Sequence, residues 1–256
     1  IAVGSLCTGK YSPARASRLL ERFLAPDSYE SLKHATPDMI ISCGASVAHV
    51  NYLFSRLNHC RSICVLRPGL LGVNRFDAVI MPGHDRPPRR KNVYRTDGAL
   101  NIVDKEHVAE QSQKLLDAYR GRLSRERRYI GFLVGGDTKH FTLQPEAVRS
   151  ALGQIKDAAL RLDYDILITT SRRTSLEVER LLEKECKDFP RCKLLINARV
   201  DNPSYALGGI LGLSAIKVVS PESISMVSEA ASCPGHVVVF GGRVDSRHDA
   251  FLRTLE

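Results

Sequence analysis

Short apolar runs alternate with longer segments of helical periodicity through the second half of the chain. Between Val148 and Leu162 the apolar residues recur every three or four positions, which predicts a helix with one buried stripe. The apolar runs on either side are short and rich in β-branched residues, which is typical of buried strands. We expect strands over residues 129–134, 165–169, 193–196, 215–219 and 236–240.

The first half shows the same alternation in shorter and less regular elements. An apolar run at 39–42 leads through Gly44 into a segment of helical spacing, and a second helical segment covers about 105–120. Strands separated by helices of this length predict parallel sheets that are connected by right-handed crossovers. The further strands expected in this half cover residues 62–66, 77–81 and 92–95.

A polar and strongly charged stretch at 121–128 separates the two halves. Such stretches are typical of linkers, so we expect an N-terminal domain of residues 1–122 and a C-terminal domain of residues 123–256. Both are expected to be Rossmann-like α/β domains with parallel sheets. Because the chain begins with Ile1 rather than Met, we also expect the first domain to be incomplete at its start.

The charge of the chain narrows its ligands to a few classes. Its 256 residues carry a formal net charge of +9, which attracts nucleic acid, anionic lipid and anionic small molecules alike. The basic residues cluster at 86–91 and 125–128, and neither cluster contains the interleaved aromatic residues on which nucleic acid strands stack. We therefore expect no nucleic acid partner, whereas a peripheral contact with an anionic membrane stays open.

The cysteines and the apolar runs indicate the cellular compartment of the protein. There are seven cysteines, with no CxxC pair and no histidine pair at zinc-finger spacing, which argues against a disulfide framework and a structural metal site. No apolar run approaches the ~20 residues that span a bilayer. We expect a cytoplasmic protein in a reducing compartment.

The first polar strand end follows the apolar run at 129–134. Gly135 and Gly136 stop this strand and allow a phosphate to approach the backbone closely. Asp137, Thr138 and Lys139 follow, and Thr138 and Lys139 add a hydroxyl and a cation. An ordinary glycine turn explains the same residues, so the motif alone leaves both interpretations open.

The second polar strand end reads ThrThrSerArgArgThr at 169–174. Ser171, Arg172 and Arg173 concentrate a hydroxyl and adjacent guanidiniums at one strand end, which favours the binding of an anion. The alternative is that Ser171 and Thr174 cap the following helix while the arginines are solvated.

The third polar strand end covers residues 220–230. Ser223, Ser225 and Met226 begin a helix whose first N–H groups have no intrahelical acceptor, and Glu229 follows beyond the first turn. A glutamate at that position can accept both hydroxyls of a ribose. Such residues are also common at ordinary helix starts, so this alternative stays open as well.

His84 and Asp85 follow a predicted strand and precede an arginine-rich loop in the first half. An imidazole beside a carboxylate can act as a general base near neutral pH, so this pair is the candidate catalytic pair of the chain. A histidine on a surface loop is the alternative interpretation.

Several motifs follow one another in a fixed order along the chain. They are ProAspMetIleIleSerCysGly at 37–44, PheAspAlaValIleMetProGlyHisAsp at 76–85, AspGlyAlaLeu at 97–100, GlyGlyAspThrLysHisPhe at 135–141, ThrThrSerArgArgThr at 169–174, AsnProSerTyrAlaLeuGlyGly at 202–209 and ProGluSerIleSerMetValSerGluAla at 221–230. In this order they resemble the mitochondrial fission (elongated mitochondria) protein family. The resemblance covers about residues 37–256.

The resemblance implies a glycosyltransferase-B-like architecture, in which two Rossmann-like domains face each other across a cleft. It also implies that the second domain binds the donor nucleotide and that the first domain holds the acceptor. The residues carried over are Gly135, Gly136, Ser171, Arg172 and Arg173 for the phosphates, Ser223, Ser225 and Met226 for the helix start, Glu229 for the ribose, and His84 and Asp85 for the acceptor side.

Our leading hypothesis is a nucleotide-sugar-dependent glycosyltransferase with no cofactor, in which the donor is a substrate and the acceptor is unknown. No DxD carboxylate pair stands at a strand end, so we expect transfer without a metal, with the arginines and helix N-termini stabilising the leaving diphosphate. A second hypothesis, implied by the plant relatives, is a non-catalytic adaptor that recruits a fission GTPase to a membrane surface. A third is a nucleotide-sugar epimerase of the same fold.

Overall fold

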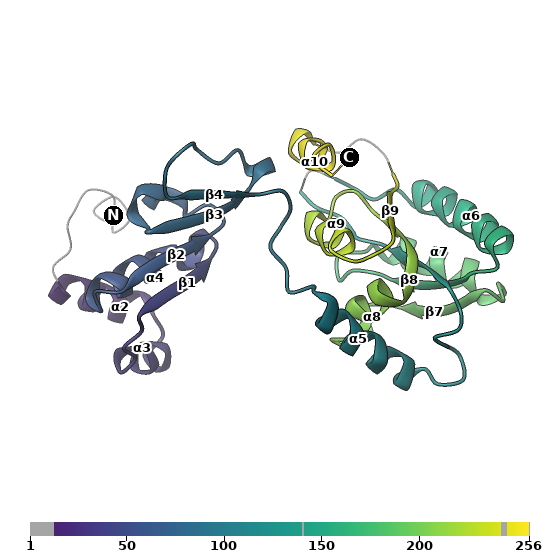
Figure 1. Cartoon of the computed structure of the whole chain (residues 1–256), viewed down its shortest axis with the longest axis horizontal. Coiled ribbons are helices and arrows are strands. Elements are labelled where there is room, and N and C mark those ends of the chain that lie inside the picture. Colours follow the sequence, from purple (N-terminus) through teal and green to yellow (C-terminus); the bar gives the residue numbers. More distant parts are fainter. Residues whose placement is uncertain (1–12, 140, 242–244, 256) are drawn as a thin grey trace. The chain divides into compact units, whose positions relative to one another are not determined.

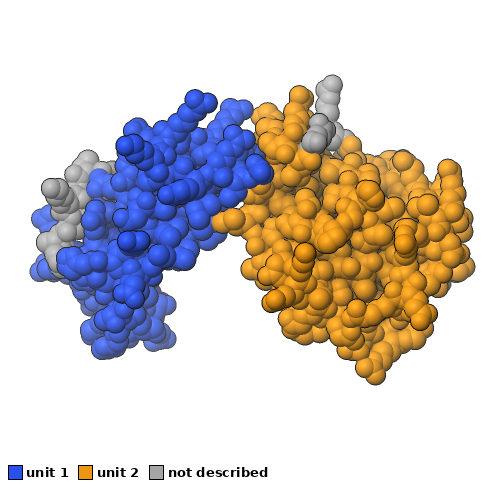
Figure 2. All heavy atoms as spheres, in the orientation of Figure 1, with its two compact units in different colours: residues 1–97 blue, residues 98–256 orange. Residues whose placement is uncertain are grey.

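The computed structural model describes residues 13–139, 141–241 and 245–255 (Figure 1). The chain divides into two compact units, residues 1–97 and residues 98–256 (Figure 2). Each unit contains one sheet of parallel strands together with α-helices. The predicted α/β fold class with two parallel sheets is therefore confirmed.

The first unit contains a four-stranded sheet in the order β1-β2-β3-β4. Side chains of α4, among them Tyr52 and Leu53, are buried against Cys64, Val79 and Met81 of the sheet. The strands are β1 (Met39–Cys43), β2 (Arg61–Val65), β3 (Ala78–Pro82) and β4 (Val93–Thr96), the helices α2 (Pro13–Phe23), α3 (Pro26–Lys33) and α4 (Ala45–Leu57), and the 3-10 helices η1 (Gly69–Leu71), η2 (Val73–Arg75) and η3 (Gly83–Asp85).

The second unit contains a five-stranded sheet in the order β7-β6-β5-β8-β9. The strands are β5 (Tyr129–Leu133), β6 (Asp165–Thr169), β7 (Cys192–Ile196), β8 (Ser214–Val219) and β9 (His236–Val239). The helices are α5 (Lys105–Ala118), α6 (Pro145–Leu162), α7 (Leu176–Lys187), α8 (Ala206–Leu213), α9 (Ile224–Ala231) and α10 (Ser246–Leu252).

Helices cover both faces of this second sheet (Figure 1). All residues of β5 and β6 are buried, as expected for central strands of a parallel sheet that is covered on both sides. One core cluster joins the sheet to α5, α8, α9 and α10, and the other joins it to α6 and α7. The apolar stripe from Val148 to Ala159 is the buried face of α6, as the spacing predicted. Leu162, the last residue of the predicted stripe, is 48% exposed because the helix ends there.

The strand order of the second sheet reverses between β5 and β8. From β5 the chain continues outward through β6 to β7, and it then returns to pair β8 with the other side of β5. Ligands of open α/β sheets bind at such a reversal, beyond the carboxyl ends of the strands. The polar strand ends after β5, β6 and β8 therefore meet at one edge of the sheet.

The two units meet in the chain between Asp97 and Gly98, ahead of the expected boundary at 122/123. The reason is that α5 belongs to the core of the second unit, where Leu115 packs with residues of α8. Glycines of α8 allow this contact, since a Cβ on Gly209 would lie 2.7 Å from the Leu115 Cβ and a Cβ on Gly212 would lie 2.2 Å from the Ser112 Oγ.

The charged stretch at 121–128 is therefore a loop inside the second unit. Arg127 Nη1 donates to Asp163 Oδ2 over 3.0 Å, and Arg127 Nε donates to Asp165 Oδ2 over 3.1 Å. These ion pairs attach the loop to the start of β6. A charged composition indicated a linker, but the partners of these charges lie within the same unit.

We predict that a fragment of residues 98–256 folds cooperatively and that a fragment of residues 123–256 does not. The shorter fragment lacks α5 and exposes the surface that Val108, Leu115 and Leu116 cover, and each such side chain contributes about 1.5–3 kcal/mol when buried. That loss is comparable to the whole stability of a domain. Urea unfolding followed by circular dichroism distinguishes the fragments, and equal stability of both would contradict the assignment of α5 to this unit.

Candidate functional site

A cavity of about 390 Å³ lies at the carboxyl ends of β5, β6 and β8 in the second unit. It is formed by the β5–α6 loop, the β6–α7 loop, the start of α9 and the start of α10. These segments are far apart in the sequence, and the sheet topology brings them to one edge. The residues that line the cavity are Thr138, Lys139, Arg173, Glu222, Ser223, Ile224, Ser225, Asp245, Arg247 and His248.

The glycines after β5 join the end of this strand to the end of β8. The Gly135 N–H donates to Ser220 Oγ over 2.8 Å, and the Gly136 N–H donates to Glu222 Oε1 over 2.7 Å. A Cβ on Gly135 would lie 1.7 Å from Glu222 Oε1, so any larger residue would displace this carboxylate. The glycines thus allow the close approach of the protein's own side chains, which already accept from both amides.

The β6–α7 loop folds back onto the same glycines. The buried Thr174 hydroxyl donates to the Gly135 carbonyl over 2.5 Å and accepts from the Ser171 N–H over 2.8 Å. The Asp137 N–H donates to the Arg173 carbonyl over 3.1 Å, and the Arg173 N–H donates to Ser171 Oγ over 3.0 Å. These hydrogen bonds hold the backbone of Arg173 beside the β5–α6 loop.

The start of α9 forms another wall of the cavity. Ser223 is the N-cap residue, and its side chain makes no capping hydrogen bond. The first N–H groups of a helix have no intrahelical acceptor, so this end carries a partial positive charge. Ser223, Ile224 and Ser225 line the cavity beside these groups.

Glu222 is a buried acid at this helix start, with 3% of its surface exposed. Its Oε1 accepts from the Gly136 N–H and from the Ser220 hydroxyl, which lies 3.1 Å away, while its buried Oε2 has no hydrogen-bond partner among the described residues. Burial raises the pKa of the Glu222 carboxyl, and backbone N–H groups, Ser220 and the charge of Arg173 oppose that rise only in part.

The start of α10 closes the cavity beside Glu222. Asp245 caps the helix by accepting from the Arg247 and His248 N–H groups over 2.9 and 3.0 Å. Its hydrogen bond with the His248 side chain lowers the pKa of Asp245 to about 2. The other ring nitrogen, His248 Nε2, lies 2.9 Å from the Glu222 carbonyl oxygen and so ties α10 to the start of α9.

The cavity combines cations with two acids, of which Asp245 is paired and Glu222 is buried. Lys139, Arg173 and Arg247 supply cationic groups. Asp245 is paired with His248, and burial disfavours the ionised form of Glu222. An anion with several oxygens suits this arrangement of cations, hydroxyls and a helix N-terminus. In the part of the chain that the structure describes, no three His, Cys, Asp or Glu side chains are grouped to hold a metal ion.

Of the predicted site residues, the cavity brings together Thr138, Arg173, Ser223 and Ser225. The loops behind it contain Gly135, Gly136, Asp137 and Ser171, whose hydrogen bonds shape the walls. The assignment of ligand contacts to these residues stays a prediction.

Three other predicted residues do not line this cavity. Arg172 is exposed beside it, and Met226 is buried in the core of the second unit. Glu229 is half-buried on the side of α9 that faces α5. Burial raises the pKa of Glu229, and the charge of His107 on α5 opposes that rise. His140, which belongs to the glycine motif, lies outside the described residues.

His84 and Asp85 lie in η3 of the first unit. His84 is buried, with 6% of its surface exposed, so it is not an ordinary histidine of a surface loop. Its Nε2 lies 3.8 Å from Asp85 Oδ1, and Arg67 Nη2 donates to the Asp85 carbonyl over 2.8 Å. The loop is thus held in place, and the role of this pair as a general base stays a prediction.

Sequence analysis missed several residues that the structure places in or behind the cavity. Glu222 stands next to the motif residue Ser223, whereas the resemblance implies Glu229 as the acid that contacts the ribose. The pair Asp245 and His248 has the spacing of an N-cap and its third helical residue, which was the available signal. The other missed residues are Ser220 and Arg247. The alternative that Ser171 and Thr174 cap the following helix is wrong, since Ser175 caps α7 and the Thr174 hydroxyl bonds the Gly135 carbonyl instead.

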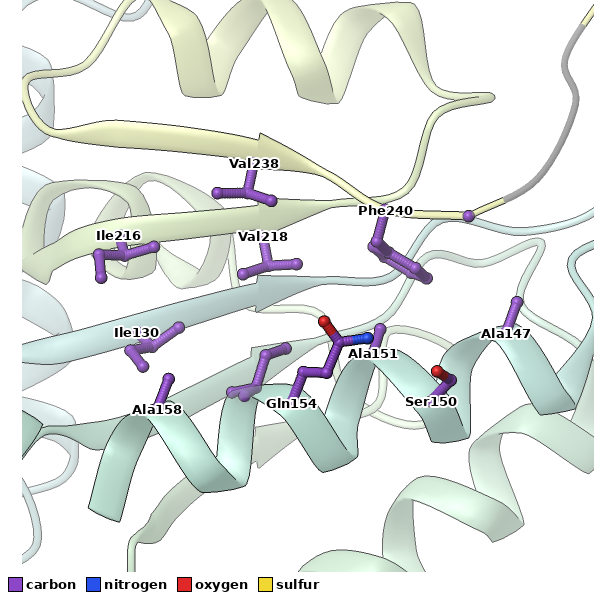
Figure 3. A pocket seen from close by; sticks show the side chains of 12 residues that line it. Ile130, Ala147, Ser150, Ala151, Gln154, Ala158, Ile216, Val218, Val238 and Phe240 are labelled. Carbon is purple, nitrogen blue, oxygen red and sulfur yellow. The ribbon is translucent and has the colours of Figure 1, made fainter. Parts of the chain in front are cut away.

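A larger cavity of about 650 Å³ lies on the face of the same sheet, between α6 and strands β5, β8 and β9 (Figure 3). Ile130, Ile216, Val218 and Phe240 line it, and Gln154 of α6 is among its few polar residues. Its described lining carries no charged side chain. Because it is apolar and lies away from the strand ends, we assign the candidate site to the smaller cavity.

The two α/β units with their parallel sheets have a glycosyltransferase-B-like fold. The chain belongs to the mitochondrial fission ELM1 family, whose family model matches residues 8–256. This bears out the resemblance found in the motifs.

Two curated proteins are similar to this chain over most of its length. One is the uncharacterized protein RP120 of Rickettsia prowazekii, 24% identical over 250 residues, which are 86% of this chain and 68% of that protein. The other is the mitochondrial fission protein ELM1 of Arabidopsis thaliana, 24% identical over 253 residues. The chain spans 85% of its own length in that match and only 54% of the length of the plant protein.

Two solved structures share the fold. The UDP-GlcNAc 2-epimerase from Neisseria meningitidis bound to UDP-GlcNAc matches 96% of this chain and 69% of its own, with a TM-score of 0.53 and 12% identity. The UDP-GlcNAc 2-epimerase from Methanocaldococcus jannaschii matches 98% of this chain and 76% of its own, with a TM-score of 0.55 and 12% identity. At this identity the likeness concerns the fold alone.

A helix that crosses a membrane must be both long and apolar. Within residues 13–139, 141–241 and 245–255, no helix combines the length and the hydropathy that a membrane crossing requires.

We predict that the unfolding free energy of the Glu222→Gln variant, relative to that of the unchanged chain, increases as the pH rises. A carboxyl whose pKa is raised by folding stabilises the fold fully below its unfolded pKa, and that contribution is lost as the pH rises through the folded pKa. Glutamine keeps an acceptor for the Gly136 N–H and does not titrate. The difference in unfolding free energy should change by up to about 1.4 kcal/mol per pH unit in this window.

Urea unfolding of both proteins from about pH 4 to about pH 8 measures this difference, and the other titrating groups cancel because both proteins contain them. A difference that stays constant over the whole range would contradict the burial of an ionisable Glu222.

Proposed function

We propose that the second unit binds the diphosphate of a nucleotide sugar in the cavity at the start of α9, and that the protein is a metal-independent glycosyltransferase. The observation that carries this proposal is the grouping of Lys139, Arg173 and Arg247 around a helix N-terminus at the reversal point of the sheet. Phosphate groups are the ligands that such a combination binds best.

The same residues suit the chemistry of glycosyl transfer. When the bond between sugar and diphosphate breaks, negative charge grows on the leaving diphosphate while the sugar develops oxocarbenium character. Arg173, Lys139 and the helix N-terminus would stabilise that charge in the way a metal ion does in other enzymes. His84 and Asp85 remain the predicted base pair for the acceptor hydroxyl.

The fold comparison supports the ligand class. One of the epimerases that share the fold is described as bound to UDP-GlcNAc, which contains a nucleoside diphosphate linked to a sugar. An epimerase of the same ligand class is therefore the first alternative. It would need no acceptor, so an epimerised nucleotide sugar formed without an acceptor would indicate the epimerase, and transfer of the sugar to an acceptor hydroxyl would indicate the transferase.

We predict that Arg173→Ala weakens the binding of a nucleoside diphosphate by about tenfold or more, because a hydrogen bond to a charged group contributes about 1.5–3 kcal/mol. Isothermal titration calorimetry with UDP, GDP, ADP and CDP first identifies the base that binds. The matched control is Arg161→Ala, which removes the same charge from the exposed last turn of α6.

Arg172→Ala tests whether diphosphate binding depends on the residues that line the cavity or on the whole motif at 169–174. Arg172 is exposed and does not line the cavity, so its replacement should weaken binding less than that of Arg173. If none of the diphosphates binds below millimolar concentration, or if the Arg161 and Arg173 variants bind equally, the proposed site is wrong.

A non-catalytic adaptor is the second candidate function, and the basic cluster at 86–91 favours it. Arg86, Arg89, Arg90 and Lys91 are exposed between η3 and β4 of the first unit. Exposed clusters of this kind contribute about 1 kcal/mol per basic residue to the binding of anionic lipid. In this role a cytoplasmic protein would contact a membrane peripherally and recruit a fission GTPase to it.

We predict that the protein floats with vesicles that contain phosphatidylserine and not with vesicles of phosphatidylcholine alone, since the attraction is electrostatic. The triple variant Arg89→Ala, Arg90→Ala, Lys91→Ala should lose this binding. A control with the same loss of charge replaces Arg149, Arg161 and Arg180, which are exposed on α6 and α7. Equal flotation of both variants would argue against this surface.

A further inference from the structure

Glu222 is an acid in the wall of a cavity that otherwise suits an anion. Its carboxyl is buried, and Oε1 occupies the space beside Gly135. A bound diphosphate would therefore bring further negative charge close to a carboxylate that is shielded from water. Like charges in such surroundings repel each other strongly.

The two carboxyl oxygens of Glu222 have different surroundings. Oε1 accepts from the Gly136 N–H and the Ser220 hydroxyl, which satisfies it in either protonation state. The buried Oε2 has no hydrogen-bond partner among the described residues, so its negative charge is poorly compensated. Oε2 is thus the atom that can take a proton without the loss of an existing hydrogen bond.

The charged groups near Glu222 come from three segments. Lys139 lies on the β5–α6 loop, Arg173 on the β6–α7 loop, and Asp245, Arg247 and His248 at the start of α10. A diphosphate bound in the cavity would draw on the same cations. Because a cation shared with the ligand compensates Glu222 less, binding should further favour the neutral form of this carboxyl.

We propose that the binding of a diphosphate in this cavity is coupled to the uptake of one proton from solvent by the Glu222 carboxylate. The inference rests on the proposed function of the same cavity. The carboxylate and one proton form a neutral carboxyl group, and the ligand keeps its own charge. Glu222 is thereby a residue of the binding site that the motifs did not assign.

The coupling between proton and diphosphate determines how the affinity for the diphosphate changes with pH. If a bound diphosphate favours the protonated carboxyl, the protonated carboxyl favours the bound diphosphate by the same factor. The affinity is therefore highest where Glu222 is neutral before binding, and it falls as the pH rises and the proton must be supplied at binding.

His248 is the competing proton acceptor, and its contacts argue against it. Nδ1 lies 2.9 Å from the Asp245 carboxylate and Nε2 lies 2.9 Å from the Glu222 carbonyl oxygen. Both neighbours are acceptors, so both hydrogen bonds form only when both ring nitrogens carry a proton.

The test measures the protons taken up on binding by isothermal titration calorimetry in two buffers of different ionisation enthalpy at the same pH. The probe is the tightest binder among UDP-, GDP- and ADP-glucose, whose diphosphate diester keeps its charge throughout the pH range. We expect uptake approaching one proton for the unchanged protein above neutral pH. Its dissociation constant should rise by about a hundredfold from about pH 5 to about pH 9, because binding weakens about tenfold for each pH unit over which nearly one proton is taken up.

Glu222→Gln should abolish the uptake and leave the dissociation constant constant within about twofold over the same pH range. The matched variants are Glu229→Gln, which makes the same chemical change at the other acid of α9, and His248→Gln. Uptake should persist in both. Persistence in Glu222→Gln, or its loss only in one of the other variants, would overturn the proposal.

A measurement on the unchanged protein covers the case that Glu222→Gln does not fold. Infrared difference spectra on addition of the same nucleotide sugar should show a new band of a protonated carboxyl group that shifts in deuterium oxide. Binding with neither the band nor proton uptake overturns the proposal and leaves the binding function standing. Absence of binding by any of the nucleotide sugars overturns the proposed function together with this inference.

Discussion

The hydrogen bond from the Gly136 N–H to Glu222 Oε1 is the contact on which the rest of the second unit's site depends. Together with the bond from Gly135 to Ser220, it joins the ends of β5 and β8 where the strand order reverses. Neither glycine can be larger, since the space of a side chain is occupied by Glu222 or by the β6–α7 loop. The position of α9, and with it the helix N-terminus in the cavity, follows from this junction.

The junction has an electrostatic cost that the surroundings only partly offset. Backbone N–H groups and the charge of Arg173 stabilise the ionised form of the Glu222 carboxyl. The loss of hydration on burial destabilises that form more, so the pKa of Glu222 is raised. The cavity therefore places an acid whose pKa is raised by burial beside Lys139, Arg173 and Arg247. Our proposal follows from this arrangement: an anionic ligand and a proton would stabilise each other in the site, because their coupling is reciprocal.

Much of the fold was predictable because its signals are local. The strands lie within one residue of the predicted ranges, since short apolar runs between turn residues determine strands by themselves. The division of the chain was not predictable in the same way. The composition of 121–128 predicted a linker, whereas Arg127 pairs with Asp163 after α6 and with Asp165 of β6, and α5 packs against the glycines of α8. Partners that are distant in sequence leave no mark in a local pattern.

For the candidate site, the sequence by itself determined which strand ends are polar, and Thr138, Arg173, Ser223 and Ser225 do line one cavity. Only the tertiary structure decided which neighbours of these residues point into it. Helix α9 turns Met226 toward the core and Glu229 toward α5, and it leaves Glu222 at the glycines. The reason is that a motif specifies residue types in order, whereas the direction of each side chain depends on the elements packed around its helix.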